Sequence, residues 1–333
     1  MIESIALMGL GLLGATTAVA SGALRCPASA RSQLTGSAPM ILRDLASAWR
    51  RDFARNDPAL SLTLVEPFGP PQGSLNPSLE RFLEGRADFS FLTREISEAD
   101  LATFRRSYGA DPVVVPVARG AWDKFGYVDA VAIIVNDANP VRRLTLRQID
   151  TAFSSSRLRG GSGDDWGALG VSQWRGRPVH IAGGGAWSGE ESARALTIRR
   201  HVLSAGGRRG IWRPAPRSGN EADVVARVAA DPLAVGYTGV GHIGPGVHAV
   251  AVALTDGSAA YLPTAITIAS GRYPLARTVD LFLPPKAVCR PRGSVDFARY
   301  VLSPAGQNVV RTLGPFLPLT TRQLRRSALL LAR

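Results

Sequence analysis

The chain has 333 residues, of which 45% are hydrophobic and 20% charged, and its formal net charge is +13. This composition excludes a disordered chain and provides material for one large or two medium-sized domains. The positive charge favours anionic partners. The arginines are dispersed, however, without a run of five or more basic residues, so the sequence indicates no nucleic-acid partner.

The N-terminal segment is an uncharged apolar run from Ser4 to Leu24. Small-residue sites at 18–20 and 28–30 are typical of signal-peptide cleavage, so we expect residues 1–30 to direct export. An uncleaved membrane anchor is the alternative, because the run has about the length that a membrane span needs.

The two cysteines are Cys26 and Cys289. They can pair in an oxidising compartment if cleavage follows Ala20, whereas Cys289 is alone if cleavage follows Ala30. The sequence leaves both outcomes open. The four histidines show no metal-ligand spacing with one another or with cysteine, so we expect no metal site.

Beyond residue 30, predicted strands and helices alternate, which is typical of an α/β fold with open, mostly parallel sheets. A Thr cap at Thr145 and apolar spacing along 41–57 are the clearest helix signals. The expected strands cover 31–37, 61–67, 87–93, 128–136, 177–183 and 233–239. The expected helices cover 41–57, 78–85, 145–154, 189–203 and 221–231, with a helix-turn-helix at 294–314.

Two enzyme motifs are present only in part. The glycines of 184–189 have the spacing of a Walker A loop, but Glu190 and Glu191 stand where Lys and Ser or Thr would hold phosphate and Mg²⁺. The G-x-G-x-x-G string at 239–244 leads into Pro245 and a strand pattern, not a helix, which argues against dinucleotide binding. Without a nucleophile–base pair, we predict neither catalysis nor a cofactor.

Six segments occur in the order expected for a known family. Together they resemble the phosphate-binding proteins that deliver ligand to bacterial ABC importers, a branch of the periplasmic binding proteins. The similarity runs from about Leu34 to Leu319. The segments are GSAPM, ADFSFLTREIS, VDAVAIIVNDANPVRRLTLRQIDTAFS, GNEADVVARVAADPLAVGYTGVGHI, YPLARTVDLFL and FARYVLSPAGQNVVRTLGPFLPL.

The resemblance implies a two-lobed clamshell. Each lobe is a mostly parallel sheet flanked by helices, and two crossing strands join the lobes. The first lobe is expected at 32–127 plus 266–333 and the second at 128–265. The ligand would lie in the cleft between them, where helix N-termini converge, and the lobes would close around it by a hinge motion.

The family's anion site carries over in part. Gly36 and Ser37 match its first turn, and Met40 matches a position often held by an apolar residue. Ser74 matches the serine turn that starts the second helix. Many relatives have Thr where this chain has Pro39, which has no N–H to donate.

The remaining matches lie in two loops. Thr93 and Arg94 follow a strand where relatives offer Ser or Asp and then Arg. Ser188 and Gly189 match the family's Ser-Gly pair. The complete set of expected ligand-binding residues is Gly36, Ser37, Met40, Ser74, Thr93, Arg94, Ser188, Gly189 and Glu190.

The loop that contains Ser188 and Gly189 departs from the family pattern at two positions. Gly184 stands where relatives usually carry Arg, and Glu190 where they carry Thr. An ionised Glu190 in the cleft would repel phosphate. Alternatively, Glu190 and Glu191 complement the dipole in the first turn of the 189–203 helix. Arg94 either replaces the missing charge or is a surface or inter-lobe arginine.

The resemblance therefore implies a monomeric, periplasmic solute-binding protein that captures phosphate or a related oxyanion and docks on an ABC importer permease. Two alternatives follow from the altered loop. The ligand has changed to a neutral, zwitterionic or cationic solute, or the cleft is degenerate and the protein serves as a sensor or secretion accessory.

Overall fold

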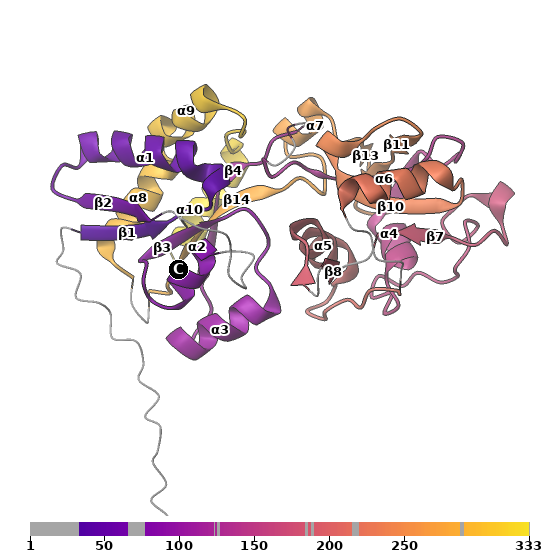
Figure 1. Cartoon of the computed structure of the whole chain (residues 1–333), viewed down its shortest axis with the longest axis horizontal. Helices are drawn as coiled ribbons and strands as arrows, with labels where there is room; N and C mark the ends of the chain where they lie inside the picture. The colour runs from indigo at the N-terminus through magenta and orange to yellow at the C-terminus, as the bar shows by residue number, and fades with distance from the viewer. Residues whose placement is uncertain are drawn as a thin grey trace, which may run out of the picture.

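The computed structural model describes residues 33–65, 77–122, 124, 127–183, 186–187, 190–214, 220–286 and 290–332. Its two principal sheets lie in two bodies beside each other (Figure 1). We call the body around the five-stranded sheet lobe 1 and the body around the four-stranded sheet lobe 2. The predicted two-lobed α/β fold is confirmed.

Lobe 1 has the strand order β2-β1-β3-β14-β4. Its strands are β1 (Gln33–Ser37), β2 (Ser61–Val65), β3 (Phe89–Leu92), β4 (Val113–Arg119) and β14 (Thr278–Leu283). Its helices are η1 (Met40–Leu42), α1 (Arg43–Asn56), α2 (Pro77–Leu83), α3 (Glu98–Tyr108), α8 (Arg292–Leu302), α9 (Pro304–Leu313) and α10 (Thr321–Leu331).

Lobe 2 has the strand order β11-β5-β10-β7 and smaller sheets beside it. Its strands are β5 (Val131–Asn136), β6 (Arg143–Thr145), β7 (His180–Ala182), β8 (Ala186–Trp187), β9 (Glu190–Glu191), β10 (Ala234–Gly239), β11 (Val247–Ala249), β12 (Ala251–Ala253) and β13 (Ala260–Tyr261). Its helices are α4 (Leu146–Phe153), η2 (Ser172–Trp174), α5 (Ala193–Ile198), η3 (Arg199–Leu203), α6 (Glu221–Ala230), η4 (Val240–His242) and α7 (Ala265–Ala269).

Both principal sheets are mixed, whereas mostly parallel sheets were expected. In lobe 1, β1 pairs with β2 and β3 in parallel, but β14 is antiparallel to β3 and β4. The reason is topological: β4 leads the chain out of lobe 1 and β14 leads it back, so β14 runs in the opposite direction. In lobe 2, β5 is antiparallel to both of its neighbours.

Capping side chains fix several helix starts. The hydroxyl of Thr145 accepts a hydrogen bond from the N–H of Gln148, as predicted. Helix α3, which the sequence reading missed, begins with a capping box of Ser97 and Asp100.

The helix expected over 189–203 begins later than predicted. Ser192 caps α5, so the regular helix starts at Ala193, and Glu190 and Glu191 pair as strand β9 with β8. The two glutamates therefore do not occupy a first helical turn, and the dipole explanation for them is wrong.

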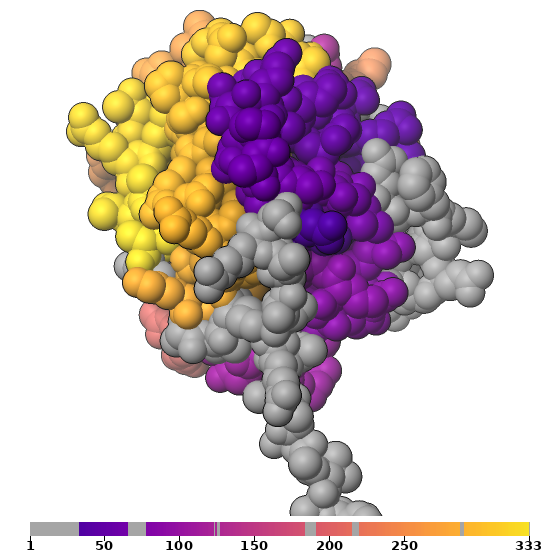
Figure 2. All heavy atoms as spheres, turned by 90° about the vertical axis from the view of Figure 1, so that its left-hand side faces the viewer, coloured from indigo at the N-terminus to yellow at the C-terminus, as the bar shows by residue number. Residues whose placement is uncertain are grey.

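The core of lobe 1 contains residues from both ends of the chain. Phe53 of α1, Phe89 and Phe91 of β3 and Phe297 of α8 are buried together. Figure 2 shows N-terminal segments in indigo packed beside C-terminal segments in yellow and orange on one face. Lobe 1 is thus complete only when the chain has returned from lobe 2.

The two crossings between the lobes run side by side. The N–H of Gly120 donates to the carbonyl oxygen of Arg277 at 3.0 Å. The buried guanidinium of Arg119 donates to carbonyl oxygens of both lobes, from Nε to Pro318 at 2.9 Å and from Nη1 to Ile268 at 2.6 Å. Ile268 packs in the core of lobe 2, so we propose that this lobe extends to about residue 275.

The predicted signal peptide of residues 1–30 lies outside the described residues. Both cysteines, Cys26 and Cys289, also lie outside them. Within the ranges that the structure describes, no helix has both the length and the apolar character needed to cross a membrane.

Replacing Phe297 with Ala tests the two-ended core of lobe 1. The ring is fully buried, with centroids 5.3 Å from Phe53 and 5.1 Å from Phe89. We expect F297A to lower the free energy of unfolding by about 3–5 kcal/mol, measured by urea denaturation. L329A, at a residue 71% exposed, is the control and should change it by less than about 0.5 kcal/mol. A loss below about 1 kcal/mol in F297A would contradict this packing.

Candidate functional site

Polar groups gather at one edge of the lobe 1 sheet. Ser37 ends β1 and Thr93 follows β3, and these parallel neighbours place their carboxyl ends at the same edge. Arg277 lies just before β14, and its Nη2 donates to the Thr93 carbonyl oxygen at 2.7 Å. The carboxyl edge of an open α/β sheet is the usual place for a ligand.

Two buried serines have unpartnered hydroxyl groups at this edge. Ser37 and Ser78 are both fully buried, and neither Oγ has a hydrogen-bond partner among the residues described. Ser90, paired in register with Ser37, donates from Oγ to the carbonyl oxygen of Ser78 at 3.2 Å and so links the group. Ser78 and Ser90 were not predicted as site residues, although a serine inside the apolar run of β3 is a usable signal.

Gly36 is required by packing. A Cβ atom at this position would lie 2.1 Å from Cζ of Phe89. The glycine therefore lets the Phe89 ring pack across β1. Met40, in η1, is 54% exposed and contributes little to the core.

The guanidinium of Arg94 is engaged within lobe 1. Its Nη1 and Nη2 donate to the two carboxylate oxygens of Asp100 at 2.5 and 3.1 Å, and Nη1 also donates to the carbonyl oxygen of Glu95. This two-pronged ion pair fixes Arg94 against the start of α3. The arrangement gives no support to Arg94 as the replacement charge.

Ser74, Ser188 and Gly189 lie outside the described residues, as does the side chain of Glu190. Glu191 turns to its own lobe. Its carboxylate accepts from Nε of Arg199 at 2.6 Å, from the indole N–H of Trp212 at 2.8 Å and from Arg209 at 3.3 Å.

A buried charge network lies beside the crossings. Asp129, fully buried, binds Nη2 of Arg194 at 2.6 Å, and Nη1 of the same guanidinium binds Glu221. Nδ1 of His242 lies 2.6 Å from the other Glu221 oxygen. Nε of Arg194 is buried and has no hydrogen-bond partner in the described part of the chain. Gly239 admits this network, because a Cβ there would lie 2.1 Å from Asp129 Oδ2.

Burial shifts the pKa of two groups near this network. Burial, together with the charge of Arg194, lowers the pKa of Arg277 to about 10. Burial raises the pKa of Glu221 above its usual value, against the effect of Arg194. The two arginines are balanced by Asp129 and Glu221, so the network is close to neutral.

One carboxylate joins the lobes directly. Glu95, between β3 and α3, lies 2.8 Å from Nε2 of His201 and 3.2 Å from Nη1 of Arg200, both in η3 of lobe 2. Burial alone would raise the pKa of Glu95, but the hydrogen bond to His201 and the neighbouring positive charges outweigh burial and lower it.

Asp280 of β14 is buried near Glu95. Burial and the charge of Glu95 raise the pKa of Asp280 to about 7, although its Oδ1 accepts a hydrogen bond from the Thr278 hydroxyl at 2.8 Å. In the described residues, no group of three His, Cys, Asp or Glu side chains is placed to hold a metal ion.

Two lobes joined by paired crossings, with polar groups at strand ends next to the junction, define a solute-binding clamshell. The sequence model for the PBP superfamily domain matches residues 28–305. The phosphate-binding protein PstS from two strains of Pseudomonas aeruginosa is 30% identical over 286 residues, which cover 84% of this chain and 81% of theirs. The chain therefore belongs to the PBP superfamily and, within it, to the PstS family.

Solved structures agree on the fold. A phosphate transport receptor of the ABC type from Vibrio cholerae matches with a TM-score of 0.52 at 17% identity, over 86% of this chain and all of that one. PstS from Borrelia burgdorferi matches with a TM-score of 0.53 at 14% identity, over 87% of this chain and all of that one.

The raised pKa of Asp280 predicts a pH-dependent effect of D280N. The folded pKa of about 7 exceeds the ordinary value of 3.8, so ionisation opposes folding increasingly as pH rises from about 4 to 7. Asn carries no charge and keeps an oxygen for Thr278. We expect D280N to be more stable than the parent by roughly 1–3 kcal/mol at pH 8 and by much less at pH 4.5, measured by urea denaturation without ligand.

The control for this experiment is D296N, which removes a carboxylate from the surface of α8 and changes net charge equally. A stability difference between D280N and the parent that does not vary with pH would show that Asp280 has no raised pKa.

Proposed function

We propose that this protein is an extracytoplasmic solute-binding protein that captures phosphate or a related oxyanion and delivers it to the permease of an ABC importer. Membership of the PstS family supports this proposal, since the relatives from P. aeruginosa are phosphate-binding proteins and the V. cholerae structure is a phosphate transport receptor. The apolar run from Ser4 to Leu24 supports export.

The observation that carries the proposal is the pair of buried hydroxyl groups of Ser37 and Ser78, which have no hydrogen-bond partner among the described residues. Buried polar atoms almost always have a hydrogen-bond partner, and leaving one without a partner costs about 1–3 kcal/mol. Both hydroxyls belong to the sheet edge where ligands usually bind. Oxygen atoms of a bound anion would accept from both of them.

Positive charge for the anion would come from Arg277 and Arg194, not from Arg94. Arg277 already contacts Thr93 at the sheet edge, and Nε of Arg194 has no hydrogen-bond partner in the ranges that the structure describes. Their opposing carboxylate, Glu221, has a raised pKa, so it gives up its negative charge more readily than an ordinary Glu. That change would favour an anion.

Closure would use the paired crossings as a hinge. The contact of Glu95 with His201 and Arg200 holds lobe 1 against lobe 2. A ligand bound between the sheet edge and the charge network would add contacts to both lobes and so favour the closed form. The closed form would then dock on the permease.

A zwitterionic solute is the second candidate. Asp129 and Glu221 balance Arg194 and Arg277, which suits a ligand with charges of both signs. An amino acid presents an ammonium group for the carboxylates and a carboxylate for the arginines. This candidate needs no change in protonation.

Ser37→Ala separates binding from folding. Its Oγ has no hydrogen-bond partner among the described residues, so we expect ligand-free S37A to be at least as stable as the parent. Loss of one hydrogen bond to an anion should weaken phosphate binding by about 10-fold or more. The measurement is isothermal titration with inorganic phosphate, after bound ligand has been removed by partial unfolding and refolding.

Ser327→Ala is the matched control, because this buried serine donates at 2.7 Å to the carbonyl oxygen of Pro116 in β4, which β3 and β14 separate from the strand of Ser37. It should lose about 1 kcal/mol of stability and keep its phosphate affinity. Equal phosphate affinity in S37A and the parent would remove Ser37 from the site. No saturable heat from the folded parent would reject phosphate, and a panel of amino acids would then test the second candidate.

A further inference from the structure

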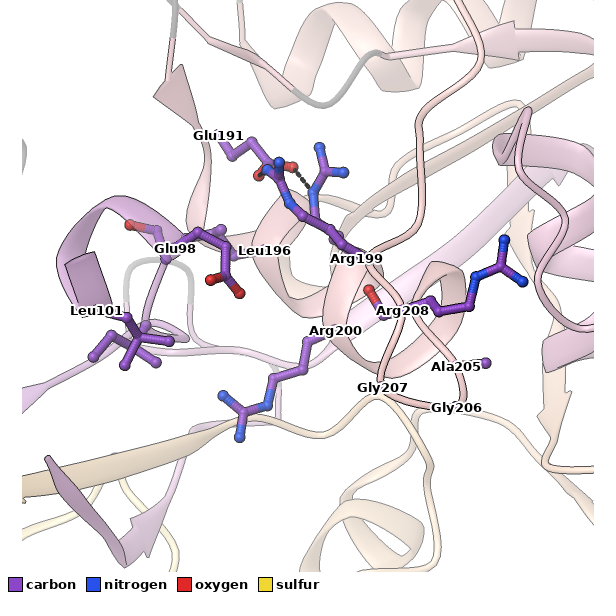
Figure 3. Close-up of a pocket in the computed structure, with 14 residues that line it drawn as sticks. Glu98, Leu101, Glu191, Leu196, Arg199, Arg200, Ala205, Gly206, Gly207 and Arg208 are labelled. Atoms are coloured by element: carbon purple, nitrogen blue, oxygen red, sulfur yellow. Dashed lines mark hydrogen bonds and ion pairs between the residues drawn. The ribbon is translucent and has the colours of Figure 1, made fainter. Parts of the chain in front are cut away.

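A cavity lies between the lobes, next to the contact of Glu95 with Arg200. Its volume is about 440 Å³, and its walls come from lobe 1 at Ile96–Glu98 and Leu101 and from lobe 2 at Glu191, Leu196, Arg199, Arg200 and 204–209. Figure 3 shows Glu98 and Leu101 on one side, facing Arg200 and the turn at Gly206 and Gly207. A water molecule takes about 30 Å³ of liquid volume, so the cavity is far larger than one phosphate ion needs.

The lobe 2 wall has more hydrogen-bond donors than acceptors. It contains Arg199, Arg200, Arg208 and Arg209. Each guanidinium has five N–H donors and no acceptor. The carboxylate of Glu191 is shared by Arg199, Arg209 and the indole of Trp212.

The side chains of Arg200 and Arg209 remain about half exposed, at 52% and 57%. Each uses one guanidinium nitrogen in its ion pair, Arg200 with Glu95 and Arg209 with Glu191. Their remaining donors are available to an anion with several oxygens. Arg208 turns away from α3 in Figure 3.

The charge on the lobe 1 wall favours an anion position near lobe 2. Glu98 carries a negative charge in the first turn of α3, where an acidic residue complements the helix dipole. An anion in the cavity would therefore bind away from Glu98 and toward Arg200 and Arg209.

The lining also limits the chemistry of the ligand. None of its residues is aromatic, so nothing in it offers a stacking surface for a nucleobase or another ring. A flexible chain with several negative charges fits the donors, the volume and the absence of rings.

We propose that this cavity is an anion subsite for a linear condensed phosphate, which places a terminal group at the arginines of lobe 2. The proposal rests on the proposed function, because the cavity adjoins the same cleft through Glu95 and Arg200. It extends the ligand class from a single oxyanion to a chain of phosphates that touches both lobes.

The test is isothermal titration with tripolyphosphate in a buffer free of divalent metal ions. The double variant R200S/R209S should weaken binding by about 10-fold or more, because two charged donors are removed. The control R325S/R326S removes two exposed arginines from α10 and has the same net charge. It should bind within about 2-fold of the parent.

The single variant E98Q tests whether removing a negative charge has the opposite effect on binding. Removing the negative charge of Glu98 should tighten tripolyphosphate binding by about 2- to 5-fold. Equal weakening in the two arginine double variants would show non-specific attraction to the basic protein and overturn the proposal. Failure of the parent to bind tripolyphosphate would also overturn it.

A parallel titration with inorganic phosphate distinguishes the two proposals. If phosphate gives no heat but tripolyphosphate shows the expected order of variants, the subsite stands and phosphate capture fails. If phosphate binds alike in the parent and in R200S/R209S while tripolyphosphate does not bind, phosphate capture stands and the subsite is overturned.

Discussion

The arrangement of the two lobes depends on the hydrogen bonding of one buried cation. Arg119 ends β4 where the chain leaves lobe 1, and burial lowers its pKa to about 10. A buried guanidinium without partners would cost several kcal/mol. Its partners are carbonyl oxygens of Pro318 and Ile268, which belong to the two different lobes. The crossing is thus held by a contact that neither lobe can supply alone.

Most of the charged groups near the cleft are likewise paired with one another. Charges of opposite sign are paired, Asp129 with Arg194 and Glu95 with Arg200. Among the described residues, the buried atoms without a hydrogen-bond partner include Ser37 Oγ, Ser78 Oγ and Arg194 Nε, each of which can donate a hydrogen bond. A ligand rich in oxygen acceptors would fit these donors.

Local patterns predicted much of the fold. The apolar run at 128–136 contains β5, all six residues of which are buried in the middle of a sheet, and Thr145 caps α4. Contacts between residues that are far apart in the sequence could not be predicted. Glu95 and His201 are 106 positions apart, and no spacing rule relates them. The start of α5 was predicted too early because Glu190 and Glu191 pair with β8 and Ser192 provides the helix cap.

The construction of lobe 1 from both chain ends has a consequence for biogenesis. Strand β3 cannot gain its neighbour β14 until about 185 further residues have been made. Until then the sheet has an open edge, whereas lobe 2 is contiguous and can fold first. Long loop closure slows folding, so the chain has a period in which it is not yet compact.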